Sequence, residues 1–215
     1  MMAEYQRLHT TGRLSSRMTA ADKAKLQARL TPFSLQPPEI AAWPATELEI
    51  GMGNGMALLE RARQQPEKLF IGNEIYLNGL RRLVGALEAT DAPLNIRIAP
   101  QDVRDVLASL PANSLHRILI PYPDPWHKAR HHKRRLIQPA VLESLHTVLQ
   151  PTGELWVMSD IPDYIDWTLA QVATHGRFAC HTHSTTPPPW WVSTKYEQKA
   201  LRAGRTPTYL MFTRQ

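Results

Sequence analysis

The chain of 215 residues carries a formal net charge of +6, and 43% of its residues are hydrophobic. This length and composition predict one sizeable globular domain and exclude a wholly disordered chain. Cys180 is the single cysteine, which excludes an internal disulfide and is typical of a cytoplasmic protein. The sequence has neither the apolar core of a signal peptide nor an apolar run of the roughly 20 residues that span a membrane. We therefore expect no membrane contact and, from the basic balance, an anionic partner.

Residues 1–45 are predicted to form an N-terminal extension with one short helix. Thr19 and Asp22 have the spacing of a capping box, and the helix that they begin is expected to end near Leu30. Four prolines between residues 32 and 44 then favour an extended, irregular chain.

From residue 46 onward, short apolar runs alternate with amphipathic segments. Strands are expected at residues 47–50, 69–71, 95–99, 115–120, 155–158, 178–182 and 208–212. Helices are expected at residues 56–64, 77–89, 103–107, 136–149 and 162–174. The alternation predicts one α/β domain over residues 46–215, with a doubly wound and mostly parallel sheet. Ligands of such sheets bind at the carboxyl ends of the strands.

A carboxylate lies at the end of each of the first five predicted strands. One or two would be unremarkable, because acidic residues often cap the helix that follows. Five at one edge of a sheet form a pattern that predicts a ligand site. They belong to Glu49, Glu74, Asp102, Asp124 and Asp160.

The stretch Gly51-Met52-Gly53-Asn54-Gly55 follows the first predicted strand and precedes a helix. Its glycines allow a tight turn and a close approach of a cofactor to the backbone. A dinucleotide site is one interpretation, but its Gly-x-Gly-x-x-Gly spacing needs the third glycine one residue later, and Glu49 would repel a pyrophosphate. S-adenosylmethionine fits better, because it has a ribose diol, an adenine and a cationic sulfonium centre but no phosphate. The remaining alternative is that the glycines only form turns and the acids only cap helices.

Individual roles follow from these positions. Glu74 is placed to accept hydrogen bonds from both ribose hydroxyls, and Asp102 from the adenine amino group. The expected cofactor-binding set also includes the carboxylate before the glycines and the glycines themselves: Glu49, Gly51, Gly53 and Gly55.

The segment Pro123-Asp124-Pro125-Trp126 is followed directly by a run of cations. The prolines restrict the loop backbone, Trp126 offers a face on which a base can stack, and Asp124 can stabilise positive charge beside a methyl-transfer path. His127 and His131 would share a helical face, yet the surrounding positive charge disfavours a metal ion, and no metal is expected. The cations are interpreted as phosphate contacts, with a solvated surface as the alternative: Lys128, Arg130, Lys133, Arg134 and Arg135.

Four motifs resemble those of the bacterial tRNA (guanine-N7)-methyltransferases. They are Leu48-Glu49-Ile50-Gly51-x-Gly53-Asn54-Gly55, Pro123-Asp124-Pro125-Trp126-His127-Lys128, Ser159-Asp160-x-x-Asp163-Tyr164 and Thr194-Lys195-Tyr196-Glu197. The resemblance implies a Rossmann-like class I methyltransferase that uses S-adenosylmethionine to methylate N7 of guanine in the variable loop of tRNA. The N-terminal extension is then expected to contact RNA.

By position, the resemblance implies cofactor binding for Glu49, Glu74, Asp102 and Asp124. It implies substrate binding for Lys128, Asp160, Thr194, Lys195, Tyr196 and Glu197. Guanine N7 has an available lone pair and needs no base, so Asp124 is the expected catalytic residue through charge stabilisation and alignment, which can supply up to about 7–11 kcal/mol. A carboxylate also suits guanine's N1–H and amino group, and both Asp124 and Asp160 are candidates for that contact.

Departures from the family pattern occur beside these motifs. Asn73 precedes Glu74 where an aliphatic residue is usual, and Trp191-Val192 replaces a frequent arginine-proline pair. Trp190-Trp191 either pack against the protein or form an aromatic platform. Two other functions stay open, a related methyltransferase acting on another RNA or a small molecule and a non-catalytic RNA-binding module. The sequence is compatible with a monomer or a homodimer.

Overall fold

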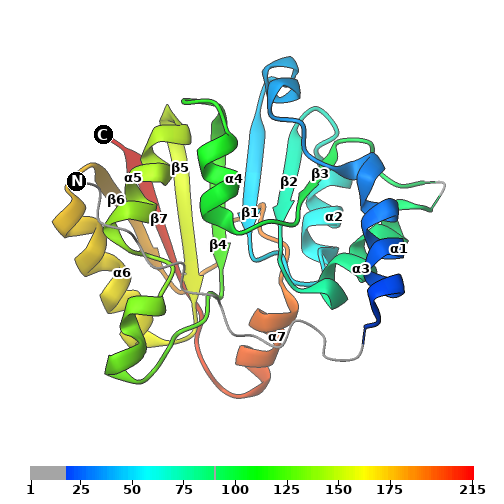
Figure 1. The fold of residues 1–215 in the computed structure, drawn as a ribbon. Helices are drawn as coiled ribbons and strands as arrows, with labels where there is room; N and C mark the ends of the chain where they lie inside the picture. Colours follow the sequence, from blue (N-terminus) through cyan, green and yellow to red (C-terminus); the bar gives the residue numbers. More distant parts are fainter. Residues whose placement is uncertain (1–17, 90) are drawn as a thin grey trace.

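The computed structural model describes residues 18–89 and 91–215, so the first part of the predicted extension lies outside the described residues. Seven strands form one sheet in the order β3-β2-β1-β4-β5-β7-β6 (Figure 1). Neighbouring strands are parallel except where β7 pairs with β5 and β6. The chain starts at the centre and winds outward to both sides, which confirms the predicted doubly wound, mostly parallel sheet. The strands are β1 (Thr46–Ile50), β2 (Leu69–Asn73), β3 (Ile96–Ala99), β4 (Leu115–Pro121), β5 (Leu149–Ser159), β6 (Phe178–Ser184) and β7 (Thr208–Arg214).

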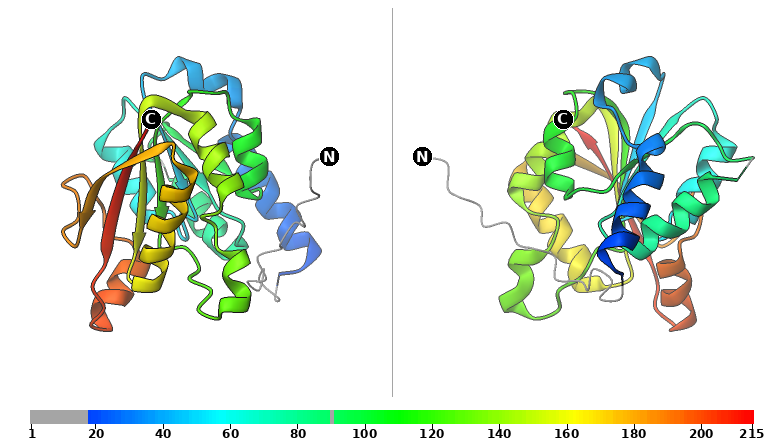
Figure 2. Two further views of the ribbon diagram at one scale, coloured as in Figure 1. Left: turned by 90° about the vertical axis from the view of Figure 1, so that its left-hand side faces the viewer. Right: turned by 45° about the vertical axis from the view of Figure 1, so that its right-hand side comes forward.

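Helices cover both faces of the sheet (Figure 2). One face packs against α4, α5 and α6, and the part of the other face formed by β1, β2 and β3 packs against α1, α2 and α3. Within the described residues no helix has the length and apolar character needed to cross a membrane. The α-helices are α1 (Ala20–Leu30), α2 (Met56–Gln64), α3 (Leu77–Leu87), α4 (Val103–Ser109), α5 (Pro139–Val148), α6 (Pro162–His175) and α7 (Lys195–Arg202), with 3-10 turns η1 (Thr31–Phe33), η2 (Pro37–Ala42) and η3 (Ala129–Arg134).

The starts of α5 and β5 differ from the expected ones, and α7 was missed. Helix α5 begins at Pro139, because a residue that precedes a proline is disfavoured in the helical conformation, and Gln138 is extended. Strand β5 begins earlier than expected, because Leu149 already pairs with Leu115 of β4 before a shift in register. Helix α7 was not expected, although its N-cap signal is in the sequence: Thr194 caps it by accepting the Glu197 N–H at 3.2 Å.

The described part of the predicted extension packs against the domain and does not stand apart from it. The capping box of Thr19 and Asp22 is present, which confirms the expected start of α1. Leu26 and Leu30 of α1 are buried in the same cluster as α3 and β3. The amide of Leu35 donates to the carbonyl of Ile98 at 3.1 Å, so this segment is tied to the edge strand β3.

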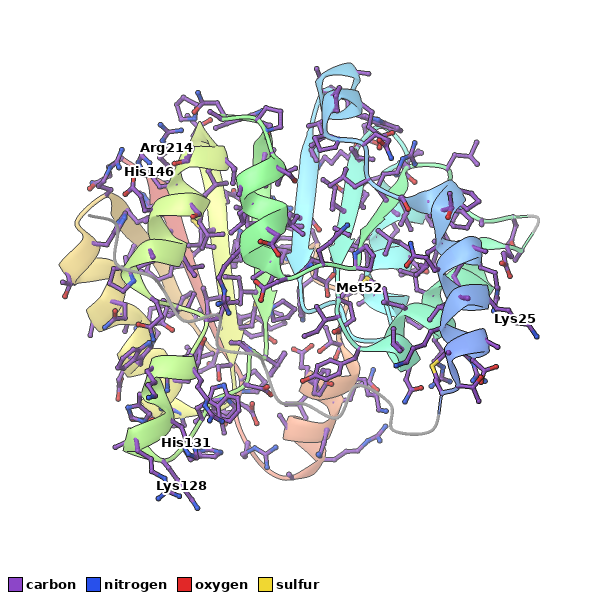
Figure 3. The ribbon with its side chains drawn as sticks, viewed as in Figure 1. Lys25, Met52, Lys128, His131, His146 and Arg214 are labelled. Atoms are coloured by element: carbon purple, nitrogen blue, oxygen red, sulfur yellow. The ribbon has the colours of Figure 1, made fainter. Side chains whose placement is uncertain are left out.

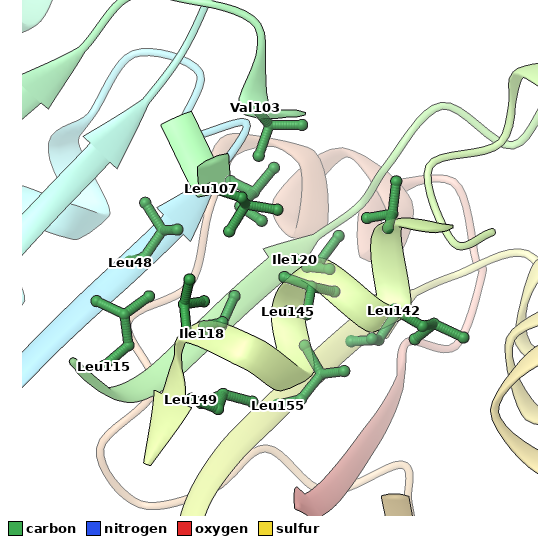
Figure 4. Close-up of a cluster of buried hydrophobic side chains, with 14 of the residues drawn as sticks. Leu48, Val103, Leu107, Leu115, Ile118, Ile120, Leu142, Leu145, Leu149 and Leu155 are labelled. Atoms are coloured by element: carbon green, nitrogen blue, oxygen red, sulfur yellow. The ribbon is translucent and has the colours of Figure 1, made fainter. Parts of the chain in front are cut away.

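The main hydrophobic core lies between the sheet and the face covered by α4, α5 and α6. Leu48 and Ile118 of the sheet meet Leu107 of α4 and Leu145 of α5 in this cluster (Figure 4). Strand β1 is buried along its whole length, yet it alternates apolar and acidic residues. Its leucine and isoleucine therefore point into this core, and its glutamates point to the opposite face.

On that opposite face, β4, β5 and β7 are covered by an aromatic segment where the other strands have helices. Trp190 and Trp191 lie over Trp156 and Tyr209 of the sheet, with ring centroids 5.2 Å and 6.4 Å apart respectively. Both tryptophans are partly buried and pack against the side chains of the sheet, so the structure favours packing over an open aromatic platform for Trp190-Trp191. The segment brings the chain from β6 back across the sheet to α7.

A row of buried charges crosses the sheet beneath the tryptophans. Glu47, Arg117 and Glu154 are cross-strand neighbours on β1, β4 and β5. Arg117 donates to Glu154 at 2.7 Å and lies within 3.4 Å of Glu47. Arg61 of α2 pairs with both Glu47 and Glu49. Its pKa is raised because the pull of the two carboxylates exceeds the opposing effect of burial.

Candidate active site

Two adjoining hollows lie at the carboxyl edge of the parallel strands. The larger one, about 460 Å³, is lined by the glycine loop, the start of α3 and the start of α7. The smaller one, about 190 Å³, contains Asp102, Asp124 and Trp126. Both are bounded by Glu74 and Tyr196, so they form one cleft. The structure therefore brings the predicted cofactor residues of four strands together.

The conformation of the glycine loop depends on its own glycines and on one glycine of α3. Gly51, Gly53 and Gly55 all have φ in the left-handed region, at 76°, 60° and 71°, where only glycine is unstrained. A close approach comes from α3, where a Cβ on Gly79 would lie 2.0 Å from the carbonyl oxygen of Gly53. Gly79 was not predicted as a site residue, because nothing in its local sequence reveals contact with a loop far away in the chain.

Glu74 is bound to the loop that it faces. One carboxylate oxygen accepts the Gly53 N–H at 2.9 Å, and the other accepts the amides of Ile75 and Tyr76 at 2.8 and 2.9 Å. A carboxylate offers about four lone-pair positions, so one remains. The expected hydrogen bonds from both ribose hydroxyls stay a prediction, with three amides already bound to Glu74 in this arrangement. Burial nevertheless raises the pKa of Glu74, and the three amides offset this only in part.

Two further cofactor carboxylates, Glu49 and Asp102, differ in how they are held. Glu49 lines the larger hollow but is buried and ion-paired with Arg61, so its charge is neutralised. Asp102 caps α4 by accepting the amide of Arg104 at 2.9 Å. The unusual Asn73 supports this end of the site: its side-chain amide donates to the carbonyls of Ala99 and Gln101, both at 2.8 Å. Asn73 thereby joins the end of β2 to the loop that presents Asp102.

Asp124 lies in a strained loop that opens into the cleft. Tyr122 and Trp126 on either side of it have φ of 52° and 45°, which is uncommon for residues other than glycine. Desolvation raises the pKa of Asp124. Burial also raises the pKa of Tyr76 and Tyr196, and the charges of Asp124 and Glu74 contribute to both shifts. Glu74 and Asp124 therefore offer negative charge to a cation in the cleft, which Arg82 and Arg104 also line.

Arg135 does not lie where a phosphate contact requires. Its residue exposure is 2%, and its guanidinium donates to the carbonyl of Pro125 at 2.9 Å and to the carboxylate of Asp163. The rings of Tyr164 and Trp167 pack against it, with centroids 5.5 and 5.1 Å from the guanidinium carbon. The predicted phosphate contact of Arg135 is corrected accordingly: this residue ties the Asp124 loop to α6.

The preceding cations are arranged differently. Lys128, Arg130 and Lys133 are exposed on the segment of η3, and Figure 3 shows Lys128 and His131 at the same end of the molecule as α7. Arg134 stacks over Trp126 at 4.9 Å, and His131 packs edge-on against the same ring at 5.8 Å. Arg134 therefore covers one face of an indole that was expected to offer a face for stacking.

The Thr194–Glu197 motif divides into two roles. Lys195 and Tyr196 line the larger hollow. Glu197 is buried and accepts hydrogen bonds from Trp191 Nε1 at 2.7 Å and from the Tyr209 hydroxyl, so it anchors α7 to the sheet. Asp160 does not line either hollow and is held by Arg205 at 2.5 Å. Both carboxylate oxygens of Glu197 are therefore engaged in this arrangement, and one oxygen of Asp160 is engaged by Arg205.

Comparison with known proteins identifies the family. Residues 45–210 match a family model described as a putative methyltransferase. The tRNA (guanine-N(7)-)-methyltransferase of Ruegeria sp. (strain TM1040) is 46% identical over 78% of this chain and 67% of that protein. The protein of the same name from Chelativorans sp. (strain BNC1) is 41% identical over 94% of this chain and 91% of that protein. The chain belongs to the tRNA (guanine-N7)-methyltransferase family.

Solved structures support the fold of this methyltransferase independently. The 16S rRNA methyltransferase KamB aligns with a TM-score of 0.60 at 13% identity, covering 92% of this chain and 94% of that chain. A 16S rRNA methyltransferase from Catenulisporales acidiphilia, solved with its cosubstrate S-adenosylmethionine, aligns with a TM-score of 0.55 at 14% identity, covering 84% and 91%. These similarities confirm the class I methyltransferase fold.

The residues of the cleft fit S-adenosylmethionine, the methyl donor of this class of enzyme. Desolvation raises the pKa of Glu74, which is buried, and of Asp124, which is exposed, and a bound sulfonium would offset the cost of the buried charge. The one lone pair left on Glu74 suits a ribose hydroxyl, and the carboxylate of Asp102 suits the adenine amino group. Among the described residues no group of three or more His, Cys, Asp or Glu side chains is placed to hold a metal ion.

Gly79→Ala is expected to displace the glycine loop of the methyltransferase, because the added Cβ would clash with a backbone carbonyl at 2.0 Å. Overpacking of this kind costs about 1–3 kcal/mol, so the affinity for S-adenosylhomocysteine should fall about tenfold or more in calorimetric titrations. Gly85→Ala on the same helix is the matched control, since its Cβ would meet only Arg29 at 3.7 Å. It should raise the free energy of unfolding by roughly 0.5–1 kcal/mol and leave the affinity unchanged. Equal affinities in the two variants would contradict the proposed packing.

Cofactor affinity should fall as the pH is lowered, because protonation removes the negative charge of Glu74 and turns one of its oxygens into a donor. The pKa of Glu74 is raised above its ordinary value of 4.5, so the loss should begin at a higher pH than for an ordinary glutamate. Folding stability should change in the opposite direction. Because the pKa of Glu74 is raised in the native state, its protonation should increase the free energy of unfolding of the ligand-free protein over the same pH range. Calorimetry with wild type, Glu74→Gln and Asp124→Asn separates the two carboxylates. Identical pH curves for wild type and Glu74→Gln would refute the assignment.

Proposed function

We propose that this protein transfers the methyl group of S-adenosylmethionine to N7 of guanine in the variable loop of tRNA. The observation that supports this most strongly is the arrangement of charge at the carboxyl edge. A negative cleft with Glu74 and Asp124 lies directly beside exposed cations of the η3 segment. A cationic cofactor suits the cleft, a polyanion suits the segment, and the chain belongs to a family whose members carry this activity in their names. An enzyme that acts on tRNA is expected to work in the cytoplasm.

The residues of the cleft have simple tasks in this reaction. When bound, S-adenosylmethionine supplies an electrophilic methyl group, and guanine N7 attacks it with a lone pair that needs no deprotonation. The protein holds the reacting atoms in line, and such alignment is worth up to about 7–11 kcal/mol. Asp124 holds the purine by the edge that carries N1–H, and because methylation at N7 makes the ring cationic, a carboxylate at that edge also stabilises the positive charge that moves onto the purine. Arg135 fixes this loop through the carbonyl of Pro125.

Asp124 is also the better candidate for reading the guanine edge. Asp160 is engaged by Arg205, whereas Asp124 opens into the cleft beside Trp126. A carboxylate accepts hydrogen bonds from guanine N1–H and from the exocyclic amine, and it faces an acceptor at N1 of adenine. Asp124 therefore selects guanine over adenine by the pattern of donors.

Incubation of the protein with tRNA and S-adenosylmethionine should produce N7-methylguanosine, detected by mass spectrometry of the digested nucleosides. A tRNA carrying inosine at the target lacks one charge-assisted hydrogen bond, so its methylation should be about ten- to a hundredfold slower. Asp124→Asn should lose both rate and this discrimination, while Asp160→Asn keeps the discrimination. Methylation of another base would favour a related enzyme, and tRNA binding without methylation would favour a non-catalytic module.

The exposed cations of the η3 segment are proposed to bind tRNA phosphates. Replacing Arg130 and Lys133 by alanine should weaken binding to all tRNAs alike and reduce the slope of log affinity against log salt concentration by about 0.7–0.9 for each phosphate interaction removed. Arg135→Met provides the contrast, because a buried guanidinium binds no phosphate. It should lower thermal stability and turnover with an unchanged salt slope. A reduced slope in Arg135→Met would restore its phosphate role.

A further inference from the structure

Helix α7 lies at the cleft because β7 runs antiparallel to its neighbours in the sheet. Thr208 at the start of β7 pairs with Ser159 at the end of β5, so β7 begins at the carboxyl edge of the parallel strands. The helix that precedes it must then lie at that edge, and Figure 1 shows α7 below the ends of the strands. Its first turn lines the larger hollow through Lys195 and Tyr196.

The outer face of α7 carries a stripe of positive charge. Lys195, Lys199 and Arg202 follow one another at spacings of four and three residues, which places them on one side of a helix. All three are exposed, whereas Glu197 and Ala200 on the other side are buried. The stripe extends over about 10 Å, since each helical residue rises about 1.5 Å.

Nearby acidic groups do not neutralise this stripe. Glu197 is the only acidic residue of α7, and it is buried and engaged by Trp191 and Tyr209. Asp160, beyond the end of the helix, is held by Arg205. Within the described part of the chain, none of the ion pairs includes the cations of the stripe.

The stripe and the η3 segment lie on different sides of the same cleft. Lys128 adjoins Asp124 in a shallow hollow on one side, and Lys195 lines the larger hollow on the other. A polyanion is repelled by the acidic interior and attracted by both borders. This charge pattern suits a nucleic acid whose phosphates contact both borders while one uncharged base enters the cleft.

We propose that Lys199 and Arg202 bind backbone phosphates of the tRNA, so that α7 and the η3 segment hold the substrate from both sides. This inference rests on the proposed function. Cations near the C-terminus of a helix also stabilise the helix dipole, by about 0.3–1 kcal/mol each. That role alone predicts a loss of thermal stability with no change in RNA binding, which makes the two roles separable.

The test compares the variant Lys199→Gln/Arg202→Gln with Arg63→Gln/Arg177→Gln. Both variants lose two positive charges, and glutamine preserves helix propensity in α7. Arg63 and Arg177 are exposed and lie at the opposite edge, near the end of α2 and directly before β6. The dissociation constant of the tRNA complex is measured with S-adenosylhomocysteine present, by fluorescence anisotropy over a series of salt concentrations, with calorimetric cofactor affinity and thermal melts as controls.

The α7 variant should lower the salt slope by about 1.4–1.8, which is about 0.7–0.9 for each of two phosphate interactions, and leave cofactor affinity unchanged. The Arg63/Arg177 variant should keep the wild-type slope. An unchanged slope in the α7 variant, or an equal fall in both variants, would overturn the inference. If the wild-type protein itself fails to bind or methylate tRNA, the proposed function fails. If the wild type methylates tRNA and only the α7 result is negative, this inference fails alone.

Discussion

The pairing of charges beneath the cleft determines what the cleft can bind. Burying a carboxylate is costly unless a cation compensates it, and β1 buries two of them. Arg61 from α2 and Arg117 from β4 provide that compensation. Because Glu49 is neutralised in this way, the negative character of the cleft comes mainly from Glu74 and Asp124. The glutamates of β1 therefore stabilise the fold, whereas the residues after β2 and β4 supply negative charge to the cleft.

The same row of charges also positions α7. Arg61 lies under Trp191 at 5.7 Å, and Arg117 lies under Trp190 at 4.1 Å, so the aromatic segment is fixed over buried cations. The indole N–H of Trp191 then reaches Glu197 in the first turn of α7. Trp191 therefore supplies a hydrogen-bond donor to a buried carboxylate. A continuous set of contacts joins the centre of the sheet to the helix beside the cleft.

The sequence was informative where the relevant physics is local. Strand and helix periodicity predicted the sheet, the closely spaced glycines marked the loop, and the acids after β2, β3 and β4 were correctly expected at one cleft. It was misleading where a residue's role depends on a distant partner. Arg135 reads as one more cation in a basic run, and only the folded chain shows that Asp163 and Pro125 engage it. Glu197 and Gly79 depend likewise on contacts that local sequence does not encode.

The three amides held by Glu74 have a consequence for the thermodynamics of ligand association. Gly53, Ile75 and Tyr76 are fixed by this carboxylate without any ligand, and Gly79 supports the same loop from behind. The conformational entropy of ordering this part of the site is therefore lost when the chain folds, not when the cofactor arrives. Association then proceeds on a preorganised surface, and less of the interaction energy is spent on immobilising the backbone. S-adenosylmethionine and its product S-adenosylhomocysteine contact the same preorganised loop. A difference in their residence times is therefore expected to arise from the positive charge at sulfur, which only S-adenosylmethionine carries.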